Sequence, residues 1–178
     1  MVRINLEAGP KGKVPDEIYV VVEIPKGLNL KYEFRDGSLF LDRVLRYNLF
    51  LPGDYGIIPS TLAEDGDNLD CVVLVNHANF PGSVIRARPI GYLEMEDEKG
   101  IDKKVIAVPV KDVDPSFSKI KNINDVSKYT LAQIRFYFEH YKSLEEGKWT
   151  KIGKFKNAKQ AKMLIKKSIK AYKEQNNE

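Results

Sequence analysis

The sequence is poor in the residues that most catalytic and structural motifs need. It has one cysteine, Cys71, two histidines and one tryptophan in 178 residues. A single cysteine cannot form a disulfide within the chain, which excludes a disulfide-stapled scaffold. Cysteine and histidine do not occur at zinc-ligand spacing, and neither a Walker phosphate loop nor a Gly-x-Ser-x-Gly motif occurs. These absences exclude the familiar zinc, P-loop and serine-hydrolase classes.

Long apolar runs are also missing. The longest, such as residues 18–22, fall far short of the ~20 residues that a membrane-spanning helix needs. The first residues lack the apolar core of a signal peptide. We therefore expect a cytoplasmic protein without a membrane partner.

The composition is that of a globular protein, with 43% hydrophobic and 30% charged residues. The length predicts a single domain spanning residues 1–178. The net charge of +4 is unevenly distributed along the chain. Residues 151–178 contain nine lysines and two glutamates, whereas residues 1–150 are slightly acidic. The basic character therefore belongs to the C-terminal segment and not to the body of the protein.

Patterns in the first ~110 residues predict strands separated by Gly and Pro turn signals. Asp36-Gly37 lies between two of these strands and is a strong hairpin signal. Many short strands at this spacing predict a small closed barrel over about residues 15–110. The predicted strands are residues 18–24, 31–34, 39–44, 71–75, 83–95 and 104–110.

The last third of the chain changes to a helical period. Leu131, Ile134, Phe138 and Tyr141 recur at helical spacing, and Leu144 continues near that stripe. This pattern predicts a helix whose apolar face packs against the barrel.

A second helix is predicted after Asn157, a good N-cap with Gln160 three residues later. Its lysines cover the face opposite the apolar stripe. The two helices are expected within about residues 127–175. The predicted fold class is α+β, mainly β: a small closed OB-like β-barrel with two C-terminal α-helices packed against it. The apolar stripe of the second helix consists of Ala161, Ile165, Ile169 and Tyr172.

Residues 65–70 carry three carboxylates, Asp65, Asp67 and Asp70. Such carboxylates repel one another and are stable together only in water or around a cation. An EF-hand is excluded because its sixth position would be Asp70 and its twelfth Asn76. A solvated acidic turn remains the alternative for this loop taken alone.

A second charged cluster, residues 97–104, lies between two predicted strands. Asp102 and Lys104 are two residues apart, so both face one side of an extended chain. Ionised side chains inside strands are costly unless they are paired or bind a metal. A structural salt-bridge network is the alternative explanation for them. Ionised side chains interrupt apolar strands at Glu23, Lys31, Glu33, Asp42 and Arg43.

Tyr141 continues the buried stripe of the first predicted helix, so its ring is expected to face the barrel. The Tyr141 hydroxyl and the Lys142 ammonium would then lie over the barrel mouth, whereas the alternative is an ordinary core tyrosine. Several carboxylates can hold Mg²⁺ or Mn²⁺, and several Lys, Arg and Tyr side chains can hold a polyanion. Together they predict metal-assisted phosphoryl chemistry on a small, highly charged phosphate.

From about residue 15 to residue 149 the ordered motifs resemble family I soluble inorganic pyrophosphatases of the prokaryotic type. The resemblance implies a Mg²⁺-dependent hydrolase that converts inorganic pyrophosphate to two phosphates. It also implies several Mg²⁺ ions per subunit, Mn²⁺ or Zn²⁺ as substitutes, and a homohexamer. The stretches that carry it are residues 18–25, 31–33, 41–43, 54–56, 65–70, 81–91, 95–97, 100–102, 106–109 and 138–142.

The resemblance also implies a role for each charged side chain. Asp67 would be the general base that takes the proton of a metal-bridging water. The implied metal ligands are Asp65, Asp70, Asp102 and, for a further ion, Asp97. The implied substrate-binding residues are Lys31, Arg43, Tyr55, Lys104, Tyr141 and Lys142, and the inner acidic shell is Glu23 and Glu33.

Three positions depart from the family pattern. Asn68 stands where Pro or Glu is usual, and asparagine suits a turn. Leu51 stands where Tyr is usual, so a hydroxyl contact worth about 1 kcal/mol is expected to be missing. Residues 153–155 read Gly-Lys-Phe in place of Glu-Gly-Trp, in a segment expected to lie away from the chemistry.

Two other functions stay open at this point. A catalytically weak OB-like module would bind phosphate or nucleic acid with the lysine-rich C-terminal helix. The acidic barrel half argues against it, because it repels backbone phosphates. Another metal phosphohydrolase acting on nucleotides or phosphoesters would need a base-binding pocket, for which the sequence carries no signal.

Overall fold

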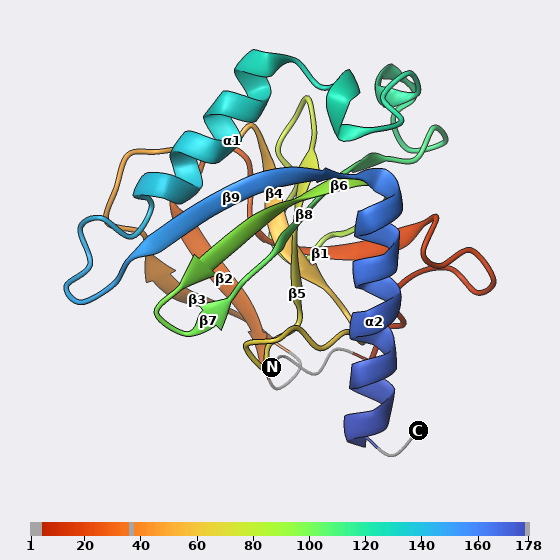
Figure 1. The fold of residues 1–178 in the computed structure, drawn as a ribbon, viewed down its shortest axis with the longest axis horizontal. Helices are drawn as coiled ribbons and strands as arrows, with labels where there is room; N and C mark the ends of the chain where they lie inside the picture. Colours follow the sequence, from red (N-terminus) through yellow and green to blue (C-terminus); the bar gives the residue numbers. More distant parts are fainter. Residues whose placement is uncertain (1–4, 36–37, 177–178) are drawn as a thin grey trace.

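The structure is a computed structural model that describes residues 5–35 and 38–176. These residues form a mainly β fold with two α-helices (Figure 1). The helices are α1 (Lys128–His140) and α2 (Ala158–Asn176), and short 3-10 turns occupy Pro115–Phe117 and Ile123–Asp125. The strands are β1 (Ile18–Ile24), β2 (Leu30–Arg35), β3 (Ser38–Val44), β4 (Gly53–Ile58), β5 (Leu69–Leu74), β6 (Val84–Asp97), β7 (Gly100–Ile101), β8 (Lys104–Pro109) and β9 (Thr150–Asn157).

Five strands close into a ring, which confirms the predicted closed, OB-like arrangement. The order is β1-β4-β5-β8-β6, and β6 returns to pair with β1. Only the β5–β8 pair within the ring is parallel. β2 and β3 pair antiparallel, as predicted for a hairpin, but they form a separate two-stranded sheet and are not part of the ring. The expected Asp36-Gly37 turn lies outside the described residues. The ring is the frame of the fold, and the charged loops that contain Asp65, Asp67 and Asp102 directly precede its strands β5 and β8.

Alternate residues of β5 divide between two hydrophobic cores. Val72 and Leu74 pack in the core that contains Phe138 of α1. Cys71 and Val73 pack in the core that contains Ile165 of α2. The period of two in the strand therefore buries both faces of the sheet, one under each helix.

The first helix is capped by Ser127, which the sequence analysis did not identify, and it ends earlier than its predicted apolar stripe. The Ser127 hydroxyl accepts a hydrogen bond from the backbone N–H of Thr130 at 3.0 Å. Ile134 and Phe138 are buried, as predicted. The expectation for Leu144 is wrong: it lies beyond the helix end and is 62% exposed.

The predicted cap of α2 is confirmed by two reciprocal hydrogen bonds. The Asn157 side chain accepts from the backbone N–H of Gln160 at 3.0 Å, and the Gln160 side chain accepts from that of Asn157 at 3.2 Å. Ala161 and Ile165 are fully buried against the sheet. Among the described residues no helix has both the length and the apolar character needed to cross a bilayer.

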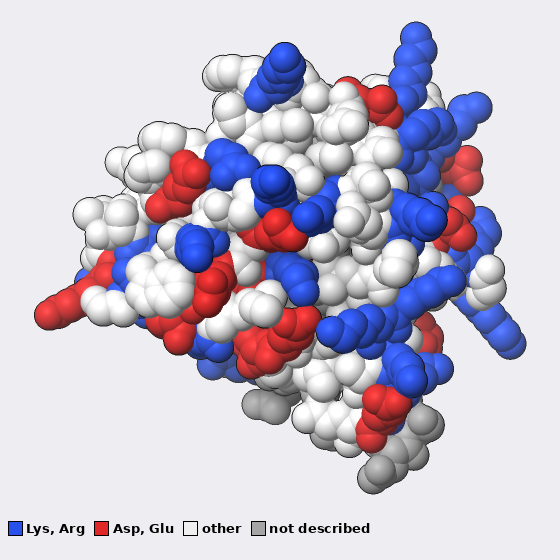
Figure 2. All heavy atoms as spheres, viewed as in Figure 1, with Lys and Arg blue, Asp and Glu red and all other residues white. Residues whose placement is uncertain are grey.

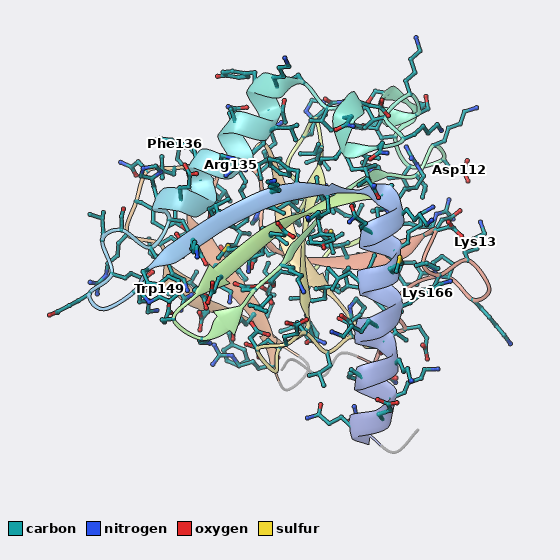
Figure 3. All side chains as sticks on the ribbon, in the orientation of Figure 1. Lys13, Asp112, Arg135, Phe136, Trp149 and Lys166 are labelled. Carbon is teal, nitrogen blue, oxygen red and sulfur yellow. The ribbon has the colours of Figure 1, made fainter. Side chains whose placement is uncertain are left out.

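Three strands, β4, β7 and β9, were not predicted from the sequence. β4 contains Gly53 and Gly56, which weaken any strand signal, but a Cβ at Gly56 would overlap the backbone carbonyl of Val21 in β1. β9 pairs along β6 and is tied to α1, because Arg135 donates to the carbonyl of Gly153 at 2.6 Å (Figure 3 labels Arg135). The departure at residues 153–155 therefore lies in a sheet strand.

Candidate active site

A cavity of about 690 Å³ lies beside the ring, and all thirteen residues predicted for the site line it. They come from β1–β6, β8, the loops before β5 and β8, and the turn after α1. In the space-filling view acidic and basic side chains are intermixed over the part occupied by β7, whereas lysines gather over α2 (Figure 2). The thirteen are Glu23, Lys31, Glu33, Arg43, Tyr55, Asp65, Asp67, Asp70, Asp97, Asp102, Lys104, Tyr141 and Lys142.

Lys104, at the start of β8, is the buried cation at the floor of this cavity. Its Nζ donates to Asp102 at 2.6 Å, to Asp70 Oδ2 at 2.5 Å and to the Tyr55 hydroxyl at 3.3 Å. Asp102 and Lys104 thus share a face, as their spacing predicts. Burial disfavours the ammonium, but Asp70 and Asp102 outweigh burial and raise the pKa of Lys104. Burial raises the pKa of Asp102 to about 6, although Lys104 opposes the shift.

Lys142, just after α1, closes another side of the cavity. Its Nζ donates to Asp97 Oδ2 at 2.6 Å and to Glu98 Oε1 at 3.0 Å. Burial acts to raise the pKa of Asp97, but the hydrogen bonds from Lys142 and from the Lys99 backbone lower it overall. Asp97 is therefore held as a carboxylate beside a cation.

The β2–β3 hairpin supplies a third group of charges. Lys31 Nζ lies 3.1 Å from Glu33 Oε1 and 4.0 Å from Glu23 Oε2. Burial raises the pKa of Glu23 to about 8, with Lys31 opposing. Arg43 Nε lies 3.9 Å from Asp42 Oδ2. Ion pairing therefore does account for these strand charges, and all of these side chains except Asp42 also line the cavity.

The acidic loop is shaped by its own backbone and by Asn68. The Asp65 carboxylate accepts from the backbone N–H of Asp67 at 3.1 Å, and Gly66 adopts a left-handed φ of 88°. The buried Asn68 amide donates to the carbonyl of Thr61 at 3.0 Å, so this departure from the family pattern anchors the loop. Burial raises the pKa of Asp65, and the neighbouring Asp70 and Asp67 add to the shift.

The donor set has the chemistry of a hard-cation site. Within the described part of the chain no three acidic, His or Cys side chains lie together closely enough to enclose a metal ion as they stand. Asp70 and Asp102 nevertheless converge on one point, now held by the Lys104 ammonium. Carboxylate oxygens without nitrogen or sulfur donors suit Mg²⁺ better than transition metals. The residue types therefore fit a hard divalent cation.

Several lining residues were missed by sequence reasoning. Leu51 packs in the core and does not line the cavity, whereas Tyr47 of the same loop does. Tyr137 precedes Tyr141 by one helical turn, a spacing that would have flagged it. Glu98 and Lys99 lie in the charged cluster of residues 97–104, whereas Arg35, Tyr47 and Lys148 lie outside any recognisable motif. The missed charged and tyrosine residues are Arg35, Tyr47, Glu98, Lys99, Tyr137 and Lys148.

One cavity on an OB-like ring contains two kinds of side chain. Its carboxylates can bind divalent cations, and its ammonium, guanidinium and phenol groups can bind a polyanion. This combination defines the class of metal-assisted phosphohydrolases. The sequence model of the inorganic pyrophosphatase family matches residues 20–173. The chain belongs to the inorganic pyrophosphatase family.

Individual relatives agree over nearly the whole chain. The inorganic pyrophosphatase of Sulfolobus acidocaldarius is 49% identical over 167 residues, which cover 93% of this chain and 96% of the relative. The solved inorganic pyrophosphatase of Helicobacter pylori superposes with a TM-score of 0.90 at 44% identity, covering 96% of this chain and 99% of that one. That of Thermus thermophilus superposes with a TM-score of 0.88 at 44% identity, covering 94% and 97%.

Proposed function

We propose that this protein hydrolyses inorganic pyrophosphate to two phosphates with Mg²⁺, and that Asp67 is the general base. The observation that carries the proposal is the convergence of all thirteen predicted residues on one cavity. The family match over residues 20–173 supports the substrate. The β9 and α2 elements pack on β6, which supports a single domain spanning residues 1–178.

Asp65, Asp70 and Asp102 would hold the catalytic Mg²⁺ ions, and Asp97 a further ion. When bound, Mg²⁺ lowers the pKa of water and shields phosphate charge. Asp67 orients the attacking water and accepts its proton at a carboxylate oxygen. The Asp67 backbone N–H donates to Asp65 Oδ1, which keeps the base beside the proposed metal ligands. No covalent enzyme intermediate is needed.

The cationic and phenolic groups hold the phosphates. Lys104 and Lys142 each lie against carboxylates at the cavity wall, and these contacts hold the two ammonium groups beside the proposed phosphate site. Charge that develops on the leaving phosphate is stabilised best by such fixed cations. The proposed phosphate-binding residues are Lys31, Arg43, Tyr55, Lys104, Tyr141 and Lys142.

The first test is phosphate release by Asp67→Asn, measured with Mg²⁺ and with a chelator. We expect a loss of at least about 100-fold in kcat, since general-base catalysis contributes about 10² to 10⁴. Asp112→Asn is the matched control, because Asp112 pairs with Arg86 at 2.9 Å and does not line the cavity (Figure 3). A variant within twofold of the wild type would remove Asp67 from its role. ATP as a parallel substrate tests selectivity for pyrophosphate.

The nucleic-acid alternative is not favoured. Part of the lysine face of α2 is already neutralised, since Lys162 lies 2.6 Å from Asp16 and Lys167 lies 3.2 Å from Glu64. We also propose a cytoplasmic homohexamer. Exposed apolar side chains on β3 support association, with Phe40 47%, Leu41 53% and Val44 55% exposed.

A further inference from the structure

Tyr47 is a cavity residue without a role in the proposed chemistry. It lies in the segment between β3 and β4, is 7% exposed, and belongs to the hydrophobic core beneath α1. Its phenol reaches the cavity wall rather than the solvent. A buried hydroxyl needs a partner, so the contacts of Tyr47 define what it can do.

The Tyr47 hydroxyl lies 2.9 Å from the hydroxyl of Tyr137, and both side chains are buried. This hydrogen bond joins the β3–β4 segment to α1. The two rings meet edge to face, with centroids 5.7 Å apart and planes at 81°. The pair is thus fixed both by its polar ends and by its rings.

Tyr141 is enclosed by this pair. Its ring stacks on Tyr137 at 5.7 Å and 18°, and it meets the edge of Tyr47 at 6.2 Å and 83°. Phe138 touches it from a third direction at 5.6 Å. Tyr137 and Phe138 belong to α1 itself, so Tyr47 is the member of this cluster that comes from outside the helix.

Tyr141 has reason to need such support. It is the C-cap of α1, so the residues after it are not helical. Tyr141 therefore has helical neighbours, Tyr137 and Phe138, on its N-terminal side only. A phenol free to change rotamer at a chain bend loses conformational entropy when it grips a phosphate. Neighbouring rings that keep Tyr141 in one rotamer remove this entropy cost, because the side chain is already ordered before the substrate binds.

We propose that Tyr47 is a positioning residue for pyrophosphate: it holds the Tyr141 ring so that the Tyr141 hydroxyl meets a phosphate oxygen. This inference rests on the proposed function and on the proposed phosphate contact of Tyr141. Tyr47 itself does not touch the substrate. Its effect is therefore on substrate binding, and it passes through Tyr141.

The test compares Tyr47→Phe and Tyr47→Leu, each with and without Tyr141→Phe. Tyr47→Leu removes the ring and is expected to raise the KM for pyrophosphate about 3- to 10-fold, with a smaller change in kcat. Tyr47→Phe keeps the ring edge, so its KM is expected to stay close to the wild-type value. This comparison remains available even if Tyr47→Leu folds poorly. In the Tyr141→Phe background the Tyr47 substitutions add no further rise in KM.

The affinity for inorganic phosphate, measured by calorimetry with Mg²⁺, gives a second readout that needs no turnover. It is expected to follow the KM in all variants. Tyr92→Phe, a half-buried tyrosine of β6 outside the cavity, is the control that leaves both quantities unchanged. The inference is overturned if the Tyr47 substitutions raise the KM as much in the Tyr141→Phe background as in the wild type. It is also overturned if they change the stability of the protein but not the KM. Absence of hydrolysis by the wild type would instead count against the proposed function.

Discussion

At the scale of single residues, the site is a set of buried charged groups. Burying them is unfavourable unless they pair with groups of opposite charge. Lys104 is 2% exposed and lies within hydrogen-bond distance of two carboxylates. Glu23 is also buried, at 5% exposed, but its cationic neighbour Lys31 is 4.0 Å away. Desolvation therefore wins at Glu23, and this carboxyl keeps its proton to an unusually high pH.

The raised pKa of Glu23, about 8 against 4.5 in the unfolded chain, predicts a pH-dependent stability of the chelated protein. The folded state favours the neutral acid, so this stabilisation is complete below pH 4.5 and is lost as the pH rises through 8. Glu23→Gln should remove up to about 4 kcal/mol of the fall in unfolding free energy between pH 5 and 9. Urea unfolding at the two pH values measures it. An unchanged pH slope in the variant would contradict the assignment.

At the scale of secondary-structure elements, β4 shows why one central strand escaped prediction. It lies between β1 and β5 in the ring and supplies Tyr55 to the cavity. Gly53 and Gly56 give no strand signal, yet both are required because neighbouring backbones approach where a side chain would stand. The cap of α2 is a local signal by contrast, and it was predicted from Asn157 and Gln160.

Gly56→Ala should therefore destabilise the fold by about 2 to 3 kcal/mol, because the methyl group meets the rigid backbone of Val21. Gly147→Ala is the comparison, since its Cβ meets open space and costs only a left-handed φ, about 1 kcal/mol. Thermal unfolding at one protein concentration measures both. Equal shifts in the unfolding temperature of the two variants would show that the steric overlap with Val21 does not determine the cost at Gly56.

At the scale of the whole molecule, apolar side chains remain uncovered on β3 and α1, including Phe40 and Phe136. A face of this kind is usually buried against another chain. The cytoplasmic location and the hexamer both stay predictions.

Light scattering on the purified protein tests the hexamer directly. We expect about six times the 20.3 kDa chain mass. Phe40→Ser should lower the mass while Lys166→Ser, on the lysine-rich face of α2, should not. A monomeric wild type, or loss of assembly in the α2 variant alone, would be inconsistent with association through β3.

The sequence by itself determined part of the donor set through local spacing: Asp102 and Lys104 share a face, and residues 65–70 form one acidic turn. The remaining site residues were identified through the resemblance of the sequence motifs to the family. The sequence also determined most strands and both helices through their periods, and the start of α2 through its cap. Only the tertiary structure decided that Lys104 neutralises Asp70, which precedes it by 34 residues, that β9 joins β6, and that Tyr47 encloses Tyr141. These contacts join segments far apart in the chain. They depend on ring closure and packing, for which local spacing carries no information.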